Sequence, residues 1–320
     1  MKAGEGEATL PIPTYQELKL PLLKLVGEGE ISRQDAVQRL IKEFQLTPEE
    51  ATRKILGGQT MIYNRTGWAS MELVKAGLIQ RPRRGVFGIT DQGRALLADP
   101  PAIITRAILA ERYPEFRDFL EASRQGGRSI DGGATGTPAA SDVEPAETTP
   151  DEQIETASKT LTAALEAELI ERIRTVHPTQ FEQIVVDLLV AMGFGGGDPE
   201  MGQRLGRSND GGIDGVIQED ALGLDAVYIQ AKRYQDGNTI GAPMLQGFVG
   251  SLIGNRATKG VFVTSSRFSP AAKQYVQTIQ HRVVLIDGEE LARLLVRHGV
   301  GVREDRRIVI KKIDEDYFNE

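Results

Sequence analysis

A long stretch near the middle of the chain is the feature that most constrains its fold. Residues 123–150 read SRQGGRSIDGGATGTPAASDVEPAETTP, which is rich in Gly, Ala, Ser, Thr and Pro and almost free of large apolar side chains. Such a segment cannot bury enough apolar surface to offset the entropy lost on ordering. We interpret it as a flexible linker between residues 1–122 and residues 151–320, each of which has the size of a compact domain.

The end of this linker carries a helix-start signal. Thr149, Pro150 and Glu152 have the spacing of a capping box with proline at the first helical position. The sequence therefore predicts a helix from this point to about Arg174.

The segment before the linker has a mostly helical pattern. Three N-cap signals precede apolar-periodic segments: Thr14 with Glu17, Ser32 with Asp35, and Thr47 with Glu50. A fourth helix is predicted over residues 64–79, where one apolar stripe carries Trp68, Met71, Val74 and Leu78 and leaves Leu73 outside. A short strand, turn and strand around Arg84-Gly85 follow. A helix followed by a basic hairpin is winged-helix order, so we expect a mostly α-helical winged-helix domain that binds DNA.

The net charge of −7 does not argue against a polyanionic partner once it is divided along the chain. Residues 1–120 hold 17 basic and 15 acidic side chains, residues 121–152 hold 2 and 7, and the remainder holds 19 and 23. Binding to DNA depends on where basic residues cluster more than on the total. The composition is that of a globular protein, and with no apolar span or secretory signal we expect no membrane role and a cytoplasmic location.

The residue inventory limits the metals that this chain can use. Cysteine is absent, and His177, His281 and His298 show no metal-ligand spacing. Zinc is therefore not expected. A metal, if used, should be a hard cation such as magnesium or manganese that is held by oxygen ligands.

The segment after the linker alternates between helices and short strands. An amphipathic helix is predicted where Phe181, Ile184, Val185, Leu188, Leu189 and Met192 share one face. Strands are predicted at residues 212–218, 225–234, 260–266 and 282–288, with helices at 242–254 and 270–280 between the last three. This order predicts an α/β domain in which helices flank a mixed sheet.

Three polar residues in this domain can converge on one site. The strand period of two places Gln230 and Lys232 on one face, and Asp214 begins a strand that a short connection can pair with theirs. Carboxylate and carbonyl oxygens bind a divalent cation, and a lysine can offset negative charge that develops on a phosphate. Such a trio is suited to phosphodiester hydrolysis.

Several motifs follow one another over nearly all of residues 175–295. They are Phe181-Glu182, the runs 210–215 (DGGIDG), 230–234 (QAKRY) and 259–264 (KGVFVT), and 285–288 (LIDG). In this order they resemble a known family, the Mrr-type restriction endonucleases, which have a PD-(D/E)xK nuclease fold with glutamine in place of the second acid. The N-terminal segment is similar to the winged-helix domain of this family at Asn64-Arg65, 67–69 (GWA), 75–78 (KAGL), Arg84-Gly85 and Ile89-Thr90.

The resemblance implies a role for each matching residue. Asp214 would ligate Mg²⁺ or Mn²⁺, Gln230 would take the place of the second acid, and Lys232 would be the catalytic lysine. It also implies a type IV restriction enzyme that acts on methylated double-stranded DNA. Because an amide is a poorer magnesium ligand than a carboxylate, Glu182 is the candidate for a further metal ligand.

Several residues have a structural alternative. Glu182 could instead close a capping box with Thr179, and the two interpretations stay open. Asp210, among glycines, fits a turn or cap better than a metal site. Arg81, Arg83 and Arg84 on the hairpin, and Arg65 on the fourth helix, are candidate DNA contacts.

Two other functions remain possible from the sequence. The chain could be a DNA-binding regulator whose nuclease-like domain is inactive, or a repair or junction nuclease of the same fold. The glycine-rich runs 193–197 and 254–260 lack the GxxxxGK[ST] pattern, so no nucleotide cofactor is expected. A double-strand cut usually requires two active sites, from which we expect a dimer or a higher homo-oligomer.

Overall fold

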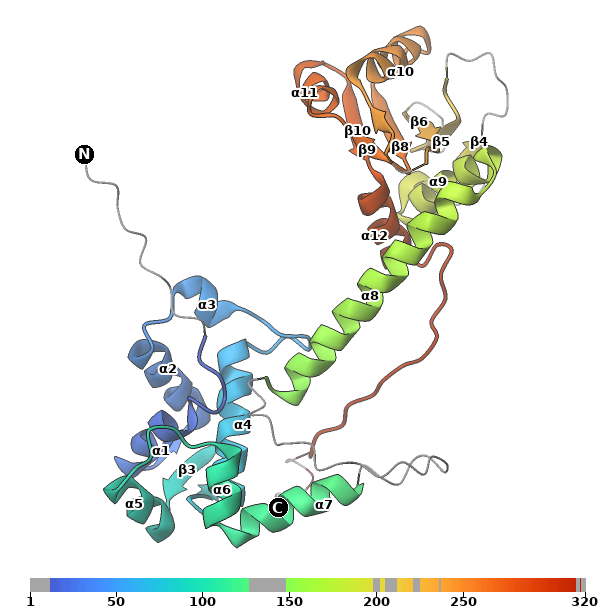
Figure 1. The fold of residues 1–320 in the computed structure, drawn as a ribbon. Helices are drawn as coiled ribbons and strands as arrows, with labels where there is room; N and C mark the ends of the chain where they lie inside the picture. Colours follow the sequence, from blue (N-terminus) through green and yellow to red (C-terminus); the bar gives the residue numbers. More distant parts are fainter. Residues whose placement is uncertain are drawn as a thin grey trace, which may run out of the picture. The chain divides into compact units, whose positions relative to one another are not determined.

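The computed structural model describes residues 12–126, 148–197, 202–204, 212–220, 225–235, 237–314 and 317. The chain forms two compact units, Met1–Ser158 and Lys159–Glu320, each described here by itself (Figure 1). Most of the linker predicted at 123–150 lies outside the described residues, so the division at residues 122 and 150 stays a prediction.

The first unit combines helices with one small antiparallel sheet of strand order β1-β3-β2. The helix α8, Pro150–Thr175, begins in this unit and ends in the second. The other elements of the first unit are α1 (Lys19–Gly27), β1 (Ile31–Ser32), α2 (Arg33–Glu43), α3 (Pro48–Thr52), α4 (Met61–Lys75), β2 (Ile79–Arg83), β3 (Val86–Ile89), α5 (Asp91–Ala98), α6 (Arg106–Arg112) and α7 (Pro114–Gly126).

Most of the predicted helix starts are confirmed. Ser32 caps α2 by accepting from the N–H of Asp35 at 3.1 Å, and Thr47 forms a capping box at the start of α3. The capping box of Thr149 with Glu152 also forms, and α8 runs to Thr175 as expected. Thr14 bonds to Glu17, but this pair closes a turn that precedes α1.

The predicted apolar stripe of α4 was wrong in part. Leu73, which the stripe excluded, is fully buried, whereas Trp68, Met71 and Val74 are only partly buried. Leu78 is fully buried but lies beyond the helix. The true buried face carries Ile62, Thr66, Ala69, Ser70, Glu72 and Leu73. Half of those side chains are polar, so hydrophobic periodicity could not identify the face.

One of these polar residues belongs to a buried charge cluster. Lys19 Nζ lies 2.5 Å from Glu72 Oε2 with both side chains fully buried, and Arg106 Nε donates to the other carboxylate oxygen of Glu72. Burial lowers the pKa of Lys19, an effect that Glu72 opposes. Burial, assisted by the charge of Glu72, raises the pKa of the neighbouring Tyr15 to about 12. Glu72 thus joins α4 to α1 and α6.

The second unit is built on a five-stranded mixed sheet of order β10-β8-β6-β5-β4. β10, β8 and β6 run parallel to one another, whereas β5 pairs antiparallel with both β6 and β4. The elements are α9 (Pro178–Ala191), the 3-10 turn η1 (Phe194–Gly197), β4 (Gly202–Arg204), β5 (Gly215–Gln218), β6 (Ala226–Lys232), β7 (Thr239–Ile240), α10 (Ala242–Gly254), β8 (Lys259–Thr264), β9 (Arg267–Phe268), α11 (Pro270–Thr278), β10 (Arg282–Ile286) and α12 (Gly288–His298).

Helices cover both faces of this sheet, which confirms the predicted α/β architecture (Figure 1). Val227, Ile229 and Ala231 of β6 pack with α9 and α12, while Tyr228 of the same strand packs on the opposite side with α10 and α11. The period of two therefore assigns the faces of β6 correctly. The short pair β7 and β9, and the helix α12, were not predicted. In the part of the chain that the structure describes, no helix is long and apolar enough to cross a membrane.

Replacing Glu72 by alanine should destabilise the protein by about 3–5 kcal/mol, because it leaves the buried charge of Lys19 uncompensated. Urea denaturation of the purified chain measures the change. The control is Glu28→Ala, which breaks an exposed pair with Arg39 and should cost no more than about 1 kcal/mol. Equal effects of the two substitutions would contradict the assigned role of Glu72.

Candidate active site

The start of β5 positions the first of the predicted site residues. The N–H of Asp214 donates to the carbonyl of Ile229 at 2.8 Å, which continues the antiparallel pairing of β5 with β6. The strand itself begins one residue later, at Gly215. The next N–H of β6 on this edge, that of Ala231, donates to the side-chain carboxylate of Asp214 at 2.8 Å. Backbone pairing thus fixes this carboxylate beside β6.

The last residue of β6 brings a positive charge to the same place. Lys232 Nζ lies 3.8 Å from Asp214 Oδ2, and the two side chains are 33% and 18% exposed. Burial raises the pKa of Asp214, while the Ala231 N–H and the Lys232 charge act in the opposite direction. The carboxyl group is therefore held in a site that disfavours its charge unless a further cation is present.

Gln230 lies between the two backbone groups that bond Asp214, those of Ile229 and Ala231. It is 7% exposed, and its Oε1 is buried with no hydrogen-bond partner among the described residues. Gly212 has a φ of +92° and lies against the amide nitrogen of Gln230. A Cβ on this glycine would lie only 2.5 Å from Gln230 Nε2. Gly212 thus leaves room for the amide, and the described residues supply no donor to its oxygen.

These three side chains offer the chemistry that a hard divalent cation requires. A carboxylate and an unpaired amide oxygen are oxygen ligands, and a buried acceptor without a partner calls for an explanation such as an ion. No group of three His, Cys, Asp or Glu that could hold a metal is found among the described residues. Asp210 lies outside them.

The alternative in which Glu182 caps its helix was wrong. The N-cap of α9 is His177, whose Nδ1 accepts from the N–H of Thr179 at 3.3 Å, with Pro178 at the first helical position. Proline presets the helical φ, so the helix begins earlier and Thr179 lies inside it. Glu182 falls in the second turn and is partly buried. Its role as a metal ligand stays a prediction.

Two residues that sequence reasoning missed hold the end of β6. Thr264 Oγ1 donates to the carbonyl of Lys232 at 2.8 Å, and the N–H of Ser265 donates to the same carbonyl at 3.3 Å. Ser265 Oγ also accepts from the N–H of Tyr234 at 2.7 Å. The run of hydroxyl residues after an apolar strand was the available signal.

The basic hairpin of the first unit is present as predicted. β2 and β3 meet at Arg84 and Gly85, where Gly85 adopts the φ of +69° that favours glycine. Arg81, Arg83 and Arg84 are exposed, and Arg83 makes an exposed ion pair with Glu30 at 3.2 Å. Their contact with DNA stays a prediction.

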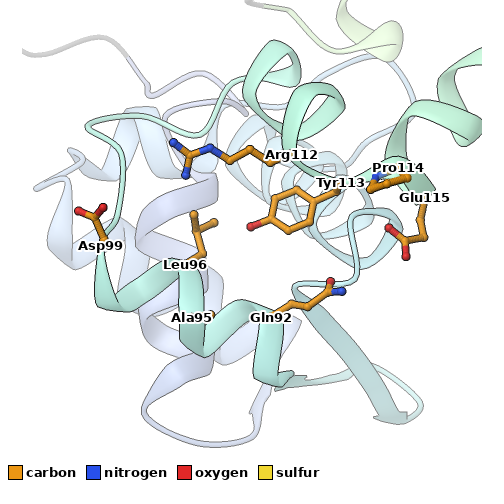
Figure 2. Close-up of a pocket in the computed structure, with 8 residues that line it drawn as sticks. All are labelled: Gln92, Ala95, Leu96, Asp99, Arg112, Tyr113, Pro114 and Glu115. Atoms are coloured by element: carbon orange, nitrogen blue, oxygen red, sulfur yellow. The ribbon is translucent and has the colours of Figure 1, made fainter.

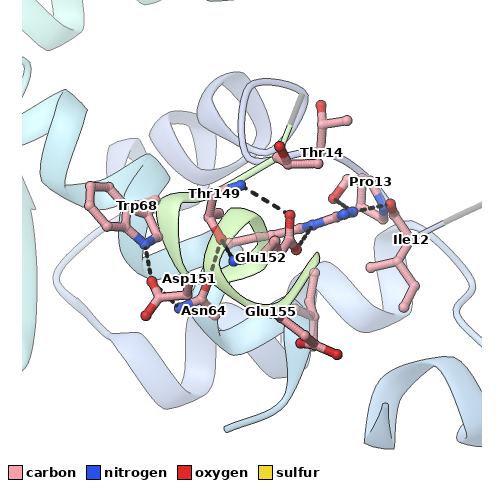
Figure 3. A network of polar contacts seen from close by, with 12 residues as sticks. Ile12, Pro13, Thr14, Asn64, Trp68, Thr149, Asp151, Glu152 and Glu155 are labelled. Carbon is pink, nitrogen blue, oxygen red and sulfur yellow. Dashed lines mark hydrogen bonds and ion pairs between the residues drawn. The ribbon is translucent and has the colours of Figure 1, made fainter. Parts of the chain in front are cut away.

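Arg65 has a different environment from the hairpin arginines. Its side chain is 11% exposed, its Nε pairs with Glu152 at 2.7 Å, and its Nη1 donates to the carbonyls of Ile12 and Pro13 (Figure 3). This conformation does not favour the predicted DNA contact. Trp68, on the same helix, donates through Nε1 to Asp151 at 2.8 Å.

A cavity of about 430 Å³ lies in the first unit, between α5 and the junction of α6 and α7 (Figure 2). None of the predicted site residues lines it. Figure 2 shows the ring of Tyr113 facing α5, and burial raises the pKa of this phenol. The lining residues are Gln92, Ala95, Leu96, Asp99, Arg112, Tyr113, Pro114 and Glu115.

Two family models match parts of this chain. Residues 173–295 match a family model described as restriction endonuclease, and residues 15–99 match the model of the Mrr N-terminal domain. The type IV methyl-directed restriction enzyme EcoKMrr of Escherichia coli (strain K12) is 36% identical over 312 residues, which cover 97% of this chain and 100% of that enzyme. The chain therefore belongs to the Mrr family of restriction endonucleases.

Two solved structures are more distant. The MspJI restriction endonuclease in complex with a 27-mer oligonucleotide is 23% identical, with a TM-score of 0.34, over 66% of this chain and 48% of that one. The DNA modification-dependent restriction endonuclease AspBHI is 22% identical, with a TM-score of 0.34, over 70% of this chain and 56% of that one. This chain thus spans about half of each, and TM-scores this low carry no conclusion.

The raised pKa of Asp214 predicts that Asp214→Asn stabilises the metal-free protein at neutral pH. A carboxyl whose pKa is higher in the folded state favours folding below its unfolded pKa, and that contribution is lost as the pH rises through the folded value. The difference in the free energy of unfolding between the variant and the wild type should therefore become smaller as the pH falls below the ordinary pKa range of an aspartate. Urea denaturation in EDTA over a pH series measures it, and a variant less stable than the wild type at neutral pH would contradict the argument.

Proposed function

We propose that this chain is a magnesium-dependent DNA endonuclease that cuts methylated double-stranded DNA, with Asp214, Gln230 and Lys232 at its active site. The observation that carries the proposal is the buried Oε1 of Gln230, which has no hydrogen-bond partner in the part of the chain that the structure describes and lies on a strand that also bonds Asp214 and ends at Lys232. An isolated buried acceptor is costly. A cation shared with the Asp214 carboxylate would satisfy it.

Asp214 and Gln230 would hold the metal. When bound, Mg²⁺ polarises the phosphate and lowers the pKa of a coordinated water. Lys232, 3.8 Å from the carboxylate, would offset negative charge on the phosphate undergoing cleavage. Manganese has the same preference for oxygen ligands and should substitute. Glu182 stays the candidate for the additional acid, and the cap of its helix is provided by His177.

The first unit would act as a winged-helix domain that binds the DNA to be cut. The order of α1, α2 and α4, followed by the β2-β3 hairpin in a sheet with β1, supports that proposal. In it, α4 is the recognition helix and the hairpin is the wing, whose Arg81, Arg83 and Arg84 contact phosphates. The exposure of all three guanidinium groups suits this role.

The preference for methylated DNA is supported by the relative from E. coli, whose name describes a methyl-directed type IV enzyme. Cutting both strands would engage two copies of the chain, so the active form is proposed to be a dimer or a higher homo-oligomer. We place it in the cytoplasm, where a restriction enzyme meets incoming DNA.

Lys232→Ala should reduce cleavage of methylated plasmid DNA in Mg²⁺ below detection while DNA affinity changes little. Cleavage is followed on gels and affinity by fluorescence anisotropy, with unmodified and branched DNA in parallel. Lys273→Ala is the control for loss of a lysine. Full cleavage by Lys232→Ala would overturn the site assignment, equal cleavage of unmodified DNA would overturn the substrate assignment, and a preference for branched DNA would favour a junction nuclease.

Replacing Arg81 and Arg84 by alanine should weaken binding to all DNA sequences alike. Each lost phosphate contact should make the dependence of log K on log salt shallower by about 0.9. Arg117→Ala, a substitution on α7, serves as the matched control. An unchanged salt dependence in the hairpin variant would contradict its role as a wing.

A further inference from the structure

The face of α4 that points away from the core is covered by the first turn of α8 (Figure 3). Asp151 Oδ2 accepts from Asn64 Nδ2 at 3.0 Å and from Trp68 Nε1 at 2.8 Å. Glu152 pairs with Arg65 at 2.7 Å, and Thr149 Oγ1 donates to Asn64 Oδ1 at 2.8 Å. Every polar side chain of α4 in this contact is thus bonded to one turn of α8.

Two of the covered side chains, Asn64 and Trp68, lie on the side of α4 opposite its buried face. At about 100° per residue they are roughly 160° and 120° from the centre of the buried face formed by Ile62, Ala69 and Leu73, and Arg65 lies at the flank, roughly 60° from it. Asparagine and arginine side chains are common readers of base edges and phosphates. Asn64 is 6% exposed, and its amide is bonded to Asp151 and Thr149.

The groups that cover them are acidic. Asp151 and Glu152 present carboxylate oxygens to an amide, an indole N–H and a guanidinium, all of which are donors that DNA could also satisfy. The segment 121–152 that leads to and includes this turn holds seven acidic and two basic side chains. Glu155 extends the contact by accepting from the N–H of Leu56 at 3.0 Å.

We propose that the outward face of α4 is a DNA-contact surface and that the acidic first turn of α8 competes with DNA for it. The proposal rests on the proposed function of the first unit. The protein would bind DNA in full only after the turn leaves α4, so its apparent affinity is lowered by the fraction of molecules in the covered state. Arg65 would remain oriented meanwhile, because its Nη1 is also held by the carbonyls of Ile12 and Pro13.

Glu152→Gln tests this competition with little change in shape. Glutamine at the third helical position can still accept from the N–H of Thr149, so the helix start is kept, while the charge opposite Arg65 is lost. In EDTA, the full-length variant should bind duplex DNA about three to ten times more tightly than the wild type at low salt. The dependence of log K on log salt should steepen by about 0.9, the amount for one added phosphate contact.

The control is Glu166→Gln, which removes one negative charge from the same helix outside the contact with α4. It should leave both quantities unchanged. Arg65→Gln added to Glu152→Gln should abolish the gain. If circular dichroism shows that Glu152→Gln does not fold, Asp151→Asn replaces it with the same expected direction.

Unchanged affinity and salt dependence in a folded variant would overturn the proposal and leave the contact as packing alone. The outcome is separable from that of the proposed function. A wild type that binds DNA and loses affinity on substitution of the hairpin arginines supports the DNA-binding role even if Glu152→Gln gives no gain. If the wild type binds no DNA at all, both the DNA-binding role of the first unit and the competition by α8 are contradicted.

Discussion

The hydrogen bond from the Ala231 N–H to the Asp214 carboxylate is the interaction on which the candidate active site depends. It forms because β5 begins at Gly215, which leaves this N–H of β6 to a side chain. The same bond holds Asp214 beside Lys232. Together with the bond from the Asp214 N–H to the carbonyl of Ile229, it ties Asp214 to the residues on both sides of Gln230. A slip of one residue between β5 and β6 would move every side chain to the other face of the sheet. The register between β5 and β6 therefore determines which side chains meet at the site.

The first unit has polar interactions within an otherwise apolar core. Glu72 is fully buried between Lys19 and Arg106, so three helices are joined through one carboxylate. A second polar contact joins α4 to α8 through Asn64, Arg65 and Trp68. Buried ion pairs of this kind contribute little net stability compared with apolar packing, but removing one partner is costly. The orientation of α4 is thus set by charges on two of its sides.

Much of the second unit could be predicted from sequence because its strands obey a simple period. The alternation in residues 226–232 assigns the faces of β6, and the order of strands and helices gives the mixed sheet. Asp214 and Lys232 could be brought together from the same pattern. The unpaired state of Gln230 Oε1 could not, because it depends on which donors surround the amide in three dimensions.

Other features had no local signal. The buried face of α4 is half polar, and the partners of its charged and polar groups lie more than 30 residues away, as with Glu72 and Arg106 or Arg65 and Glu152. The Thr179 capping signal misled because Pro178 starts the helix two residues earlier than the box requires. The strands β7 and β9 have two residues each, too few for periodicity to show.

Calorimetric titration of Mn²⁺ into the metal-free full-length protein measures whether Asp214 and Gln230 hold a divalent cation. We expect a saturable site that is lost in Gln230→Leu and in Asp214→Asn. Mn²⁺ should bind more weakly as the pH falls, because the cation favours the charged form of a carboxyl whose pKa is raised by burial. Equal Mn²⁺ binding by the wild type and Gln230→Leu would show that Gln230 does not hold the cation.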